Sequence, residues 1–170
     1  MGIITQPQLI VKIMQKFKDQ YGSTWKSRLM YIFRRILFMM RSWFFDVEYR
    51  SVPRQWIEEF LEYWKKNILP NLHYEAEFFD CDDFARWFIF KLREYIHNKY
   101  SIWYNGNGET LGVVYHNGEL LGGHAWVLVV DDTEEEIGRI DFVEPQIGEF
   151  LDDNLNSSDG WHYEIQAVIV

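Results

Sequence analysis

The stretch Phe78-Phe79-Asp80-Cys81-Asp82-Asp83-Phe84-Ala85 decides the expected fold, because it places the only cysteine of the chain at a predicted helix start. Aspartates in the first turn and an apolar repeat behind them predict a helix from about Cys81 to His97. A thiol at a helix start lies at the positive end of the macrodipole, which favours the nucleophilic thiolate. Much of the helix circumference is apolar, so we expect this helix at the centre of the fold.

The segments on either side of this helix differ in pattern. Apolar spacing predicts helices from Pro7, from Trp25 to Ser42 and from Ser51 to just before Pro70. After Tyr100 the pattern changes to strands separated by turn signals. Helices first and antiparallel strands later form an α+β layout. We expect a helical part over residues 1–70 packed on a core of residues 71–170, together one compact domain.

Five strand segments and one tight turn are central to this expectation. Strands are predicted over Ser101–Tyr104, Leu111–His116, His124–Val130 and Ile137–Val143, and Trp161–Val170 closes the sheet. Asn117-Gly118 is a strong signal for a two-residue hairpin turn. Both alternating sets of the His124–Val130 strand are apolar, which predicts that the strand is covered on both faces.

The net charge of −9 conceals an asymmetry between the two halves of the chain. Residues 1–70 carry 12 Lys/Arg and 6 Asp/Glu, whereas residues 71–170 carry 5 Lys/Arg and 20 Asp/Glu. The acidic half argues against a nucleic-acid partner and favours divalent cations. The simplest expectation for the basic half is that its helices pack against the acidic half.

No segment has the pattern of a membrane span or a secretory signal. The most hydrophobic run, Leu29 to Phe45, is interrupted by Arg34, Arg35 and Arg41. The N-terminus lacks a basic region followed by an apolar one, so we expect a cytoplasmic protein. The broad apolar surface of the Trp25–Ser42 helix indicates burial on several sides, contact with a membrane surface or pairing with a second chain. A homodimer through the N-terminal helices is therefore one expectation.

Two later motifs supply the partners that a reactive thiol needs. Gly123-His124-Ala125-Trp126 begins one predicted strand, and Phe142-Val143-Glu144-Pro145-Gln146 ends the next. A cysteine, a histidine and an acid in this order can act as nucleophile, base and orienter of the imidazole. Since Glu144 ends the strand expected to pair with the His124 strand, the three side chains are predicted to meet in one pocket.

The motifs around Cys81, His124 and Glu144 resemble the C-terminal cysteine-protease domain of the Marasmius oreades agglutinin family over about residues 74–150. The resemblance implies a papain-like fold and a calcium-dependent thiol protease, with Cys81 as nucleophile, His124 as base and Glu144 as third member. It implies Asp82, Asp83, Glu144 and Gln146 as calcium ligands.

The chain departs from the papain-like pattern at the oxyanion hole. Residues 72–77 hold no glutamine, so the expected donors are Tyr74 and the backbone N–H of Cys81.

The charges around the thiol bear on metal binding independently of the resemblance. Asp80, Asp82 and Asp83 flank Cys81, and nearby carboxylates disfavour a thiolate. A bound Ca²⁺ would neutralise part of this charge through hard oxygen ligands. We therefore expect calcium-dependent activity, against the simpler alternative that the aspartates cap the helix and face water. With one cysteine and no Cys/His cluster, zinc is not expected.

The main functional prediction is a papain-like cysteine hydrolase, a thiol peptidase, acting on a protein or peptide substrate. Two alternatives stay open on the same residues. One is a transglutaminase-like deamidase or transamidase that uses the same triad. The other is a non-catalytic interaction module of the same fold that binds a partner through its first two helices.

Overall fold

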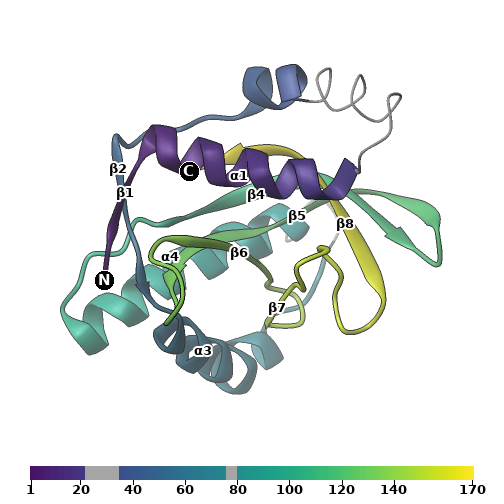
Figure 1. Ribbon diagram of the computed structural model, residues 1–170. Helices are drawn as coiled ribbons and strands as arrows, with labels where there is room; N and C mark the ends of the chain where they lie inside the picture. The colour runs from purple at the N-terminus through teal and green to yellow at the C-terminus, as the bar shows by residue number, and fades with distance from the viewer. Residues whose placement is uncertain (22–34, 76–79) are drawn as a thin grey trace.

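The computed structural model describes residues 1–21, 35–75 and 80–170, which form an α+β fold (Figure 1). The helices are α1 (Gln6–Tyr21), α3 (Arg54–Tyr63) and α4 (Cys81–Tyr100), and residues 35–41 are also helical. A π-helical turn (Trp64–Ile68) and a 3-10 turn (Leu69–Asn71) continue α3. The strands are β1 (Ile3–Thr5), β2 (Glu48–Arg50), β3 (Val52–Pro53), β4 (Asn107–His116), β5 (Glu119–Asp132), β6 (Arg139–Glu144), β7 (Glu149–Phe150) and β8 (Trp161–Ile169).

The main sheet has the strand order β7-β6-β5-β4-β8, and all neighbours in this order are antiparallel. The short strand β3 pairs with the end of β5 in parallel, and β1 and β2 pair with each other. Asn117 and Gly118 both have positive φ, 52° and 79°, as a tight hairpin turn with the twist of its strands requires. The predicted turn between β4 and β5 is confirmed.

Strand β5 is covered on both faces, as its two apolar sets predict. Trp126, Leu128 and Val130 point into one hydrophobic cluster, which also contains Leu9 and Ile13 of α1. Ala125, Val127 and Val129 point into a second cluster with buried residues of α3 and α4. Figure 1 shows α1 on one side of the sheet and α3 with α4 on the other. Residues 1–70 therefore supply side chains to both hydrophobic clusters.

Helix α4 begins at Cys81 as predicted and ends three residues later than expected. Its buried side chains recur at helical spacing and pack against β5: Phe84, Ala85, Phe88, Leu92 and Ile96. Ser101 ends the helix in the left-handed conformation at φ 57°, and its N–H donates to the carbonyl of His97 at 2.8 Å. The predicted central position of this helix is confirmed.

Several predicted elements differ from the structure. The prediction of a strand over Ser101–Tyr104 is wrong, because this segment is irregular. The Tyr104 hydroxyl hydrogen-bonds to the carbonyls of Gly106 and Val130, and these bonds hold the end of the segment against β5. The third helix begins at Arg54 because Ser51, Val52 and Pro53 are extended, the latter two pairing with β5.

Most of the helix predicted from Trp25 lies outside the described residues, and a homodimer through it stays a prediction. Across the described ranges, no helix combines the length and the apolar character needed to cross a membrane.

Candidate functional site

Cys81, His124 and Glu144 line one pocket of about 330 Å³. Cys81 is the first residue of α4, His124 lies on β5, and Glu144 is the last residue of β6. Because α4 packs against β5 and β5 pairs with β6, three segments far apart in sequence converge there. Tyr74 and Gln146 also line the pocket, so all the predicted catalytic and oxyanion residues lie around it.

The imidazole of His124 is held between a carboxylate and the thiol. Its Nε2 lies 2.7 Å from Oε2 of Glu144, whose side chain is almost completely buried. Oε1 of Glu144 accepts the backbone N–H of Gln146 at 2.9 Å, so both carboxylate oxygens are engaged. Cys81 lines the same pocket as the ring and acts on its protonation. The arrangement is that of a thiol, a base and an acid that orients the base.

The surroundings of His124 change its protonation. Burial lowers the pKa of the ring, but the hydrogen bonds and charges of Cys81 and Glu144 outweigh it and raise the pKa from 6.5 to about 9. At neutral pH the folded protein therefore holds His124 as an imidazolium beside the carboxylate of Glu144. A histidine in this state can stabilise a thiolate and can donate a proton.

Two aromatic residues that sequence reasoning missed hold the carboxylate end of the site. Nε1–H of the buried Trp64 donates to the carbonyl of Pro145 at 2.8 Å, which fixes the backbone just after Glu144. Tyr163 lines the pocket beside Glu144, and burial together with the charge of Glu144 raises the pKa of this tyrosine. The apolar pattern of the third predicted helix does place Trp64 inward. The partner of its N–H, 81 residues away, has no local signal in the sequence.

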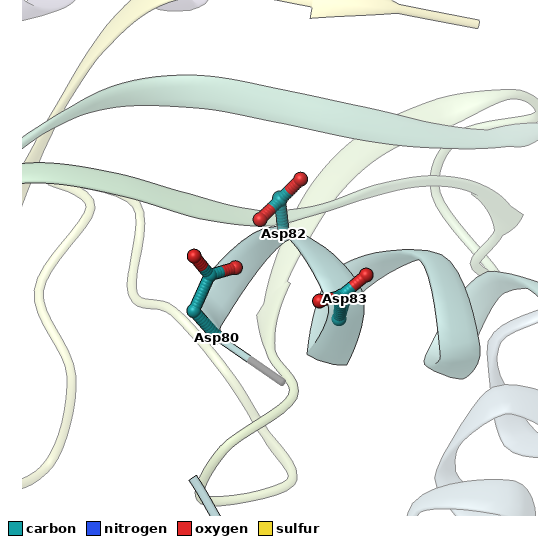
Figure 2. A group of neighbouring side chains, drawn as sticks. All are labelled: Asp80, Asp82 and Asp83. Carbon is teal, nitrogen blue, oxygen red and sulfur yellow. The ribbon is translucent and has the colours of Figure 1, made fainter. Parts of the chain in front are cut away.

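A group of three carboxylates lies at the first turn of α4 (Figure 2), on the residues that flank Cys81 in sequence. Among the described residues, Asp80, Asp82 and Asp83 offer oxygen atoms that all lie within 4.8 Å of one another. Asp82 also forms an ion pair with Arg86 at 2.6 Å. A hydrogen bond with Asp80 and partial burial raise the pKa of Asp82, while the charge of Arg86 acts in the opposite direction. One oxygen of Asp80 is buried and has no hydrogen-bond partner within residues 1–21, 35–75 and 80–170.

The three aspartates suit a hard divalent cation better than the calcium ligands predicted from the resemblance, which are Asp82, Asp83, Glu144 and Gln146. Carboxylate oxygens are the ligands that Ca²⁺ prefers, and one buried oxygen of Asp80 makes no hydrogen bond to the part of the chain that the structure describes. Asp82 and Asp83 belong to the group, whereas Glu144 uses both oxygens for His124 and the N–H of Gln146. Calcium at Asp82 and Asp83, Gln146 as its ligand and Tyr74 as oxyanion donor stay predictions.

Comparison with known proteins gives a likeness of fold only. No protein-family model and no curated protein matches the sequence. A solved structure described as the PSL1a-E64 complex matches with a TM-score of 0.59 and 18% identity, over 99% of this chain and 50% of that chain. Polyporus squamosus lectin bound to the human-type influenza-binding epitope Neu5Aca2-6Galb1-4GlcNAc matches with a TM-score of 0.52 and 23% identity, over 76% and 42%. The chain thus spans about half the length of the lectin chains whose fold it has.

These likenesses correct the main functional prediction. The assignment as a papain-like thiol peptidase is wrong: the solved structures with this fold are a PSL1a complex and a Polyporus squamosus lectin. No sequence match supports the resemblance to the agglutinin protease domain either. The prediction failed because a cysteine, a histidine and an acid in one pocket specify a local geometry, and a geometry alone does not specify a reaction.

Proposed function

We propose that the chain is a ligand-binding module and that its ligand occupies the pocket around Cys81, His124 and Glu144. The observation that supports this most is the fold that it has in common with lectin chains, in one case over 99% of its length. This chain spans about half the length of those chains, so we propose, for this chain, binding of the ligands that their structures name.

The lining of the pocket suits a polar ligand with an apolar face. Aromatic side chains of Trp161 and Tyr163 stand beside the polar groups of Asp159 and Gln146 and the charged pair of His124 and Glu144. A pocket of about 330 Å³ lies at the small end of the range for ligand sites, and a few convergent polar groups on apolar walls are their usual lining. Ordered polar groups of both signs favour a ligand that donates and accepts hydrogen bonds.

Direct binding measurements test this proposal with the two ligands that the related structures name. We expect E64 or the glycan Neu5Aca2-6Galb1-4GlcNAc to bind the chain in isothermal titration calorimetry. Gly123→Phe places a ring in the pocket, where no atom lies closer than 4.0 Å to an added Cβ. It should weaken binding by about tenfold or more.

Asp153→Asn is the matched control, since Asp153 is an exposed acid outside the pocket. This substitution should leave the affinity unchanged. Failure of both ligands to bind, or binding that is indifferent to Gly123→Phe, contradicts the proposal.

The pocket that brings Cys81 to the hydrogen-bonded pair of His124 and Glu144 favours a second candidate, a transglutaminase-like deamidase or transamidase with a papain-like arrangement of helix and sheet. The Cys81 thiolate would attack the side-chain carbonyl of a glutamine, and the His124 imidazolium would give its proton to the departing ammonia. Water would then cleave the thioester to leave glutamate, or an amine would take the acyl group to form a new amide. Glu144 would hold the imidazole in place throughout.

Two measurements separate the candidates. Ammonia release from glutamine peptides that is lost in Cys81→Ala and in His124→Gln supports the thiol chemistry. A mass increase of the protein after incubation with E64, mapped to Cys81, would show that this thiol forms a bond with the ligand. Reversible binding that persists in Cys81→Ala, without ammonia release by the native chain, supports the binding module alone.

A further inference from the structure

A second cavity, of about 680 Å³, lies at the opposite end of α4 from Cys81. Its walls come from the last turns of α4, the irregular segment that follows, and strands β1 and β2. Arg93, which lines it, is twelve residues after Cys81, or ~18 Å along the helix at 1.5 Å per residue. The cavity is therefore separate from the pocket described above, with a volume in the middle of the range for ligand sites.

One wall of the cavity is an exposed aromatic surface. The side chain of Trp103 is 71% exposed, and its ring stacks on that of His97 with centroids 3.7 Å apart and planes 15° apart. His97 covers one face of the indole and holds it, which leaves the other face to solvent. Phe90, about two helical turns before His97 in α4, is 55% exposed and lines the same cavity. A large aromatic surface kept rigid and exposed is costly in water and marks a binding site.

The rim of the cavity carries polar groups of both charges. Arg50 and Arg93 stand on it together with Glu48 and Glu94. Nε of Arg93 donates a hydrogen bond to the side-chain oxygen of Asn107 at 2.7 Å, and Nη2 donates one to its backbone oxygen at 3.2 Å. Burial lowers the pKa of this guanidinium, which shows how little water surrounds it.

Part of this hydrogen-bonding capacity is unused within the described residues. Nη1 of Arg93, the side-chain amide of Asn98 and the carboxylate of Glu48 make no hydrogen bond to another described group. A charged ligand would meet one favourable and one unfavourable charge at this rim. A neutral ligand with hydroxyl groups avoids that conflict, because each hydroxyl both donates and accepts.

We infer that this cavity is a second binding site, which takes a neutral saccharide. The flat C–H face of a sugar ring lies on the open face of Trp103, and its hydroxyls bond Arg93, Asn98 and Glu48. The inference goes beyond the proposed function, which concerns the pocket at Cys81, and either can hold without the other.

Saturation-transfer NMR and calorimetry with lactose, cellotriose and triacetylchitotriose test the inference on the full chain. We expect at least one of these sugars to bind, and Trp103→Ala to weaken its affinity by about tenfold or more. Trp103→Phe keeps a smaller aromatic face and should retain part of the affinity. The matched control is Trp87→Ala, which removes a 39% exposed tryptophan of α4 outside the cavity and should change nothing.

Two charged aromatic compounds complete the experiment. Naphthoate and naphthylmethylammonium should both bind more weakly than the best sugar. The inference is overturned if no sugar binds, if binding survives Trp103→Ala, or if either charged compound binds more tightly than every sugar.

Binding of E64 to each variant keeps the two sites apart. Unchanged E64 binding by Trp103→Ala identifies a local loss at the cavity. For a variant that has lost both ligands, circular dichroism determines whether it has unfolded, and Trp103→Phe then decides the inference.

Discussion

Oε2 of Glu144 lies 2.7 Å from Nε2 of His124 because of the register between β5 and β6. Val127 pairs with Val143, and one further residue along the ladder sets Glu144 opposite Trp126. His124 is the next residue of β5 on that face, so the two side chains are diagonal neighbours, within reach of long side chains. The contact therefore depends on a sheet register more than on any local motif.

Replacement of this carboxylate should lower the pKa of the imidazole. Glu144→Gln keeps an oxygen near Nε2 but removes the charge that, with Cys81, holds the pKa of His124 at about 9. We expect the pKa to fall toward or below its ordinary value, since burial then acts with less opposition. The titration of the His124 ring protons by NMR measures this directly. An unchanged pKa in the variant would show that Glu144 does not stabilise the imidazolium.

The stability of the protein should fall as the pH rises from about 6.5 to 9. The folded chain holds a proton on His124 that the unfolded chain releases above pH 6.5. The stabilisation is thus complete below pH 6.5 and is lost as the pH passes through 9. Its size is on the order of 3 kcal/mol, since each pKa unit corresponds to 1.36 kcal/mol.

Urea unfolding at a series of pH values gives this slope. His124→Gln should remove most of it, whereas His162→Gln, which changes an exposed histidine outside the triad, should preserve it. Equal slopes in the native chain and in His124→Gln would assign the pH dependence to other groups.

Calcium should raise the melting temperature if the carboxylates of the first turn of α4 bind it. A ligand that binds only the folded state stabilises it by about 2.7 kcal/mol at 100 times its Kd. The double variant Asp80→Asn, Asp83→Asn should abolish the shift between EDTA and calcium chloride. Because the pKa of Asp82 is raised, protons compete with the cation for its carboxylate. The rise in melting temperature caused by calcium should therefore become smaller as the pH falls.

Glu134→Gln with Glu135→Gln removes two exposed charges elsewhere and serves as the control. A calcium shift equal in the native chain and in the Asp80/Asp83 double variant would place the cation somewhere else.

Gly112 should tolerate no side chain, although its neighbour in the sheet does. It pairs with His124 across β4 and β5, and a Cβ added there would lie 2.1 Å from the carbonyl oxygen of Glu164 and 2.6 Å from the ring of Trp126. We expect Gly112→Ala to cost about 2 kcal/mol or more, because backbone cannot move aside cheaply.

Gly123→Ala is the matched comparison, since the nearest atom to its added Cβ is 4.0 Å away. Differential scanning calorimetry of the two variants measures the contrast. Equal melting temperatures would mean that the sheet near His124 relaxes more easily than its packing indicates.

The helices and strands around the site can be predicted from the sequence, whereas most contacts between their side chains cannot. The aspartates and apolar repeat from Asp80 locate the start of α4, and alternation in β5 locates His124, since both signals are local. The engagement of both Glu144 oxygens and the bond from Trp64 to Pro145 arise from register and packing between distant segments. No periodicity and no turn residue in the sequence predicts these long-range contacts.

Helix α4 serves two cavities at once, with Cys81 at its first residue and Arg93 and His97 toward its end. A rotation of the helix by one residue, about 100°, would turn the side chains away from both. Two cavities therefore constrain the rotational position of α4 about its axis. A related protein that lost one cavity would still need the same position of the helix to keep the other.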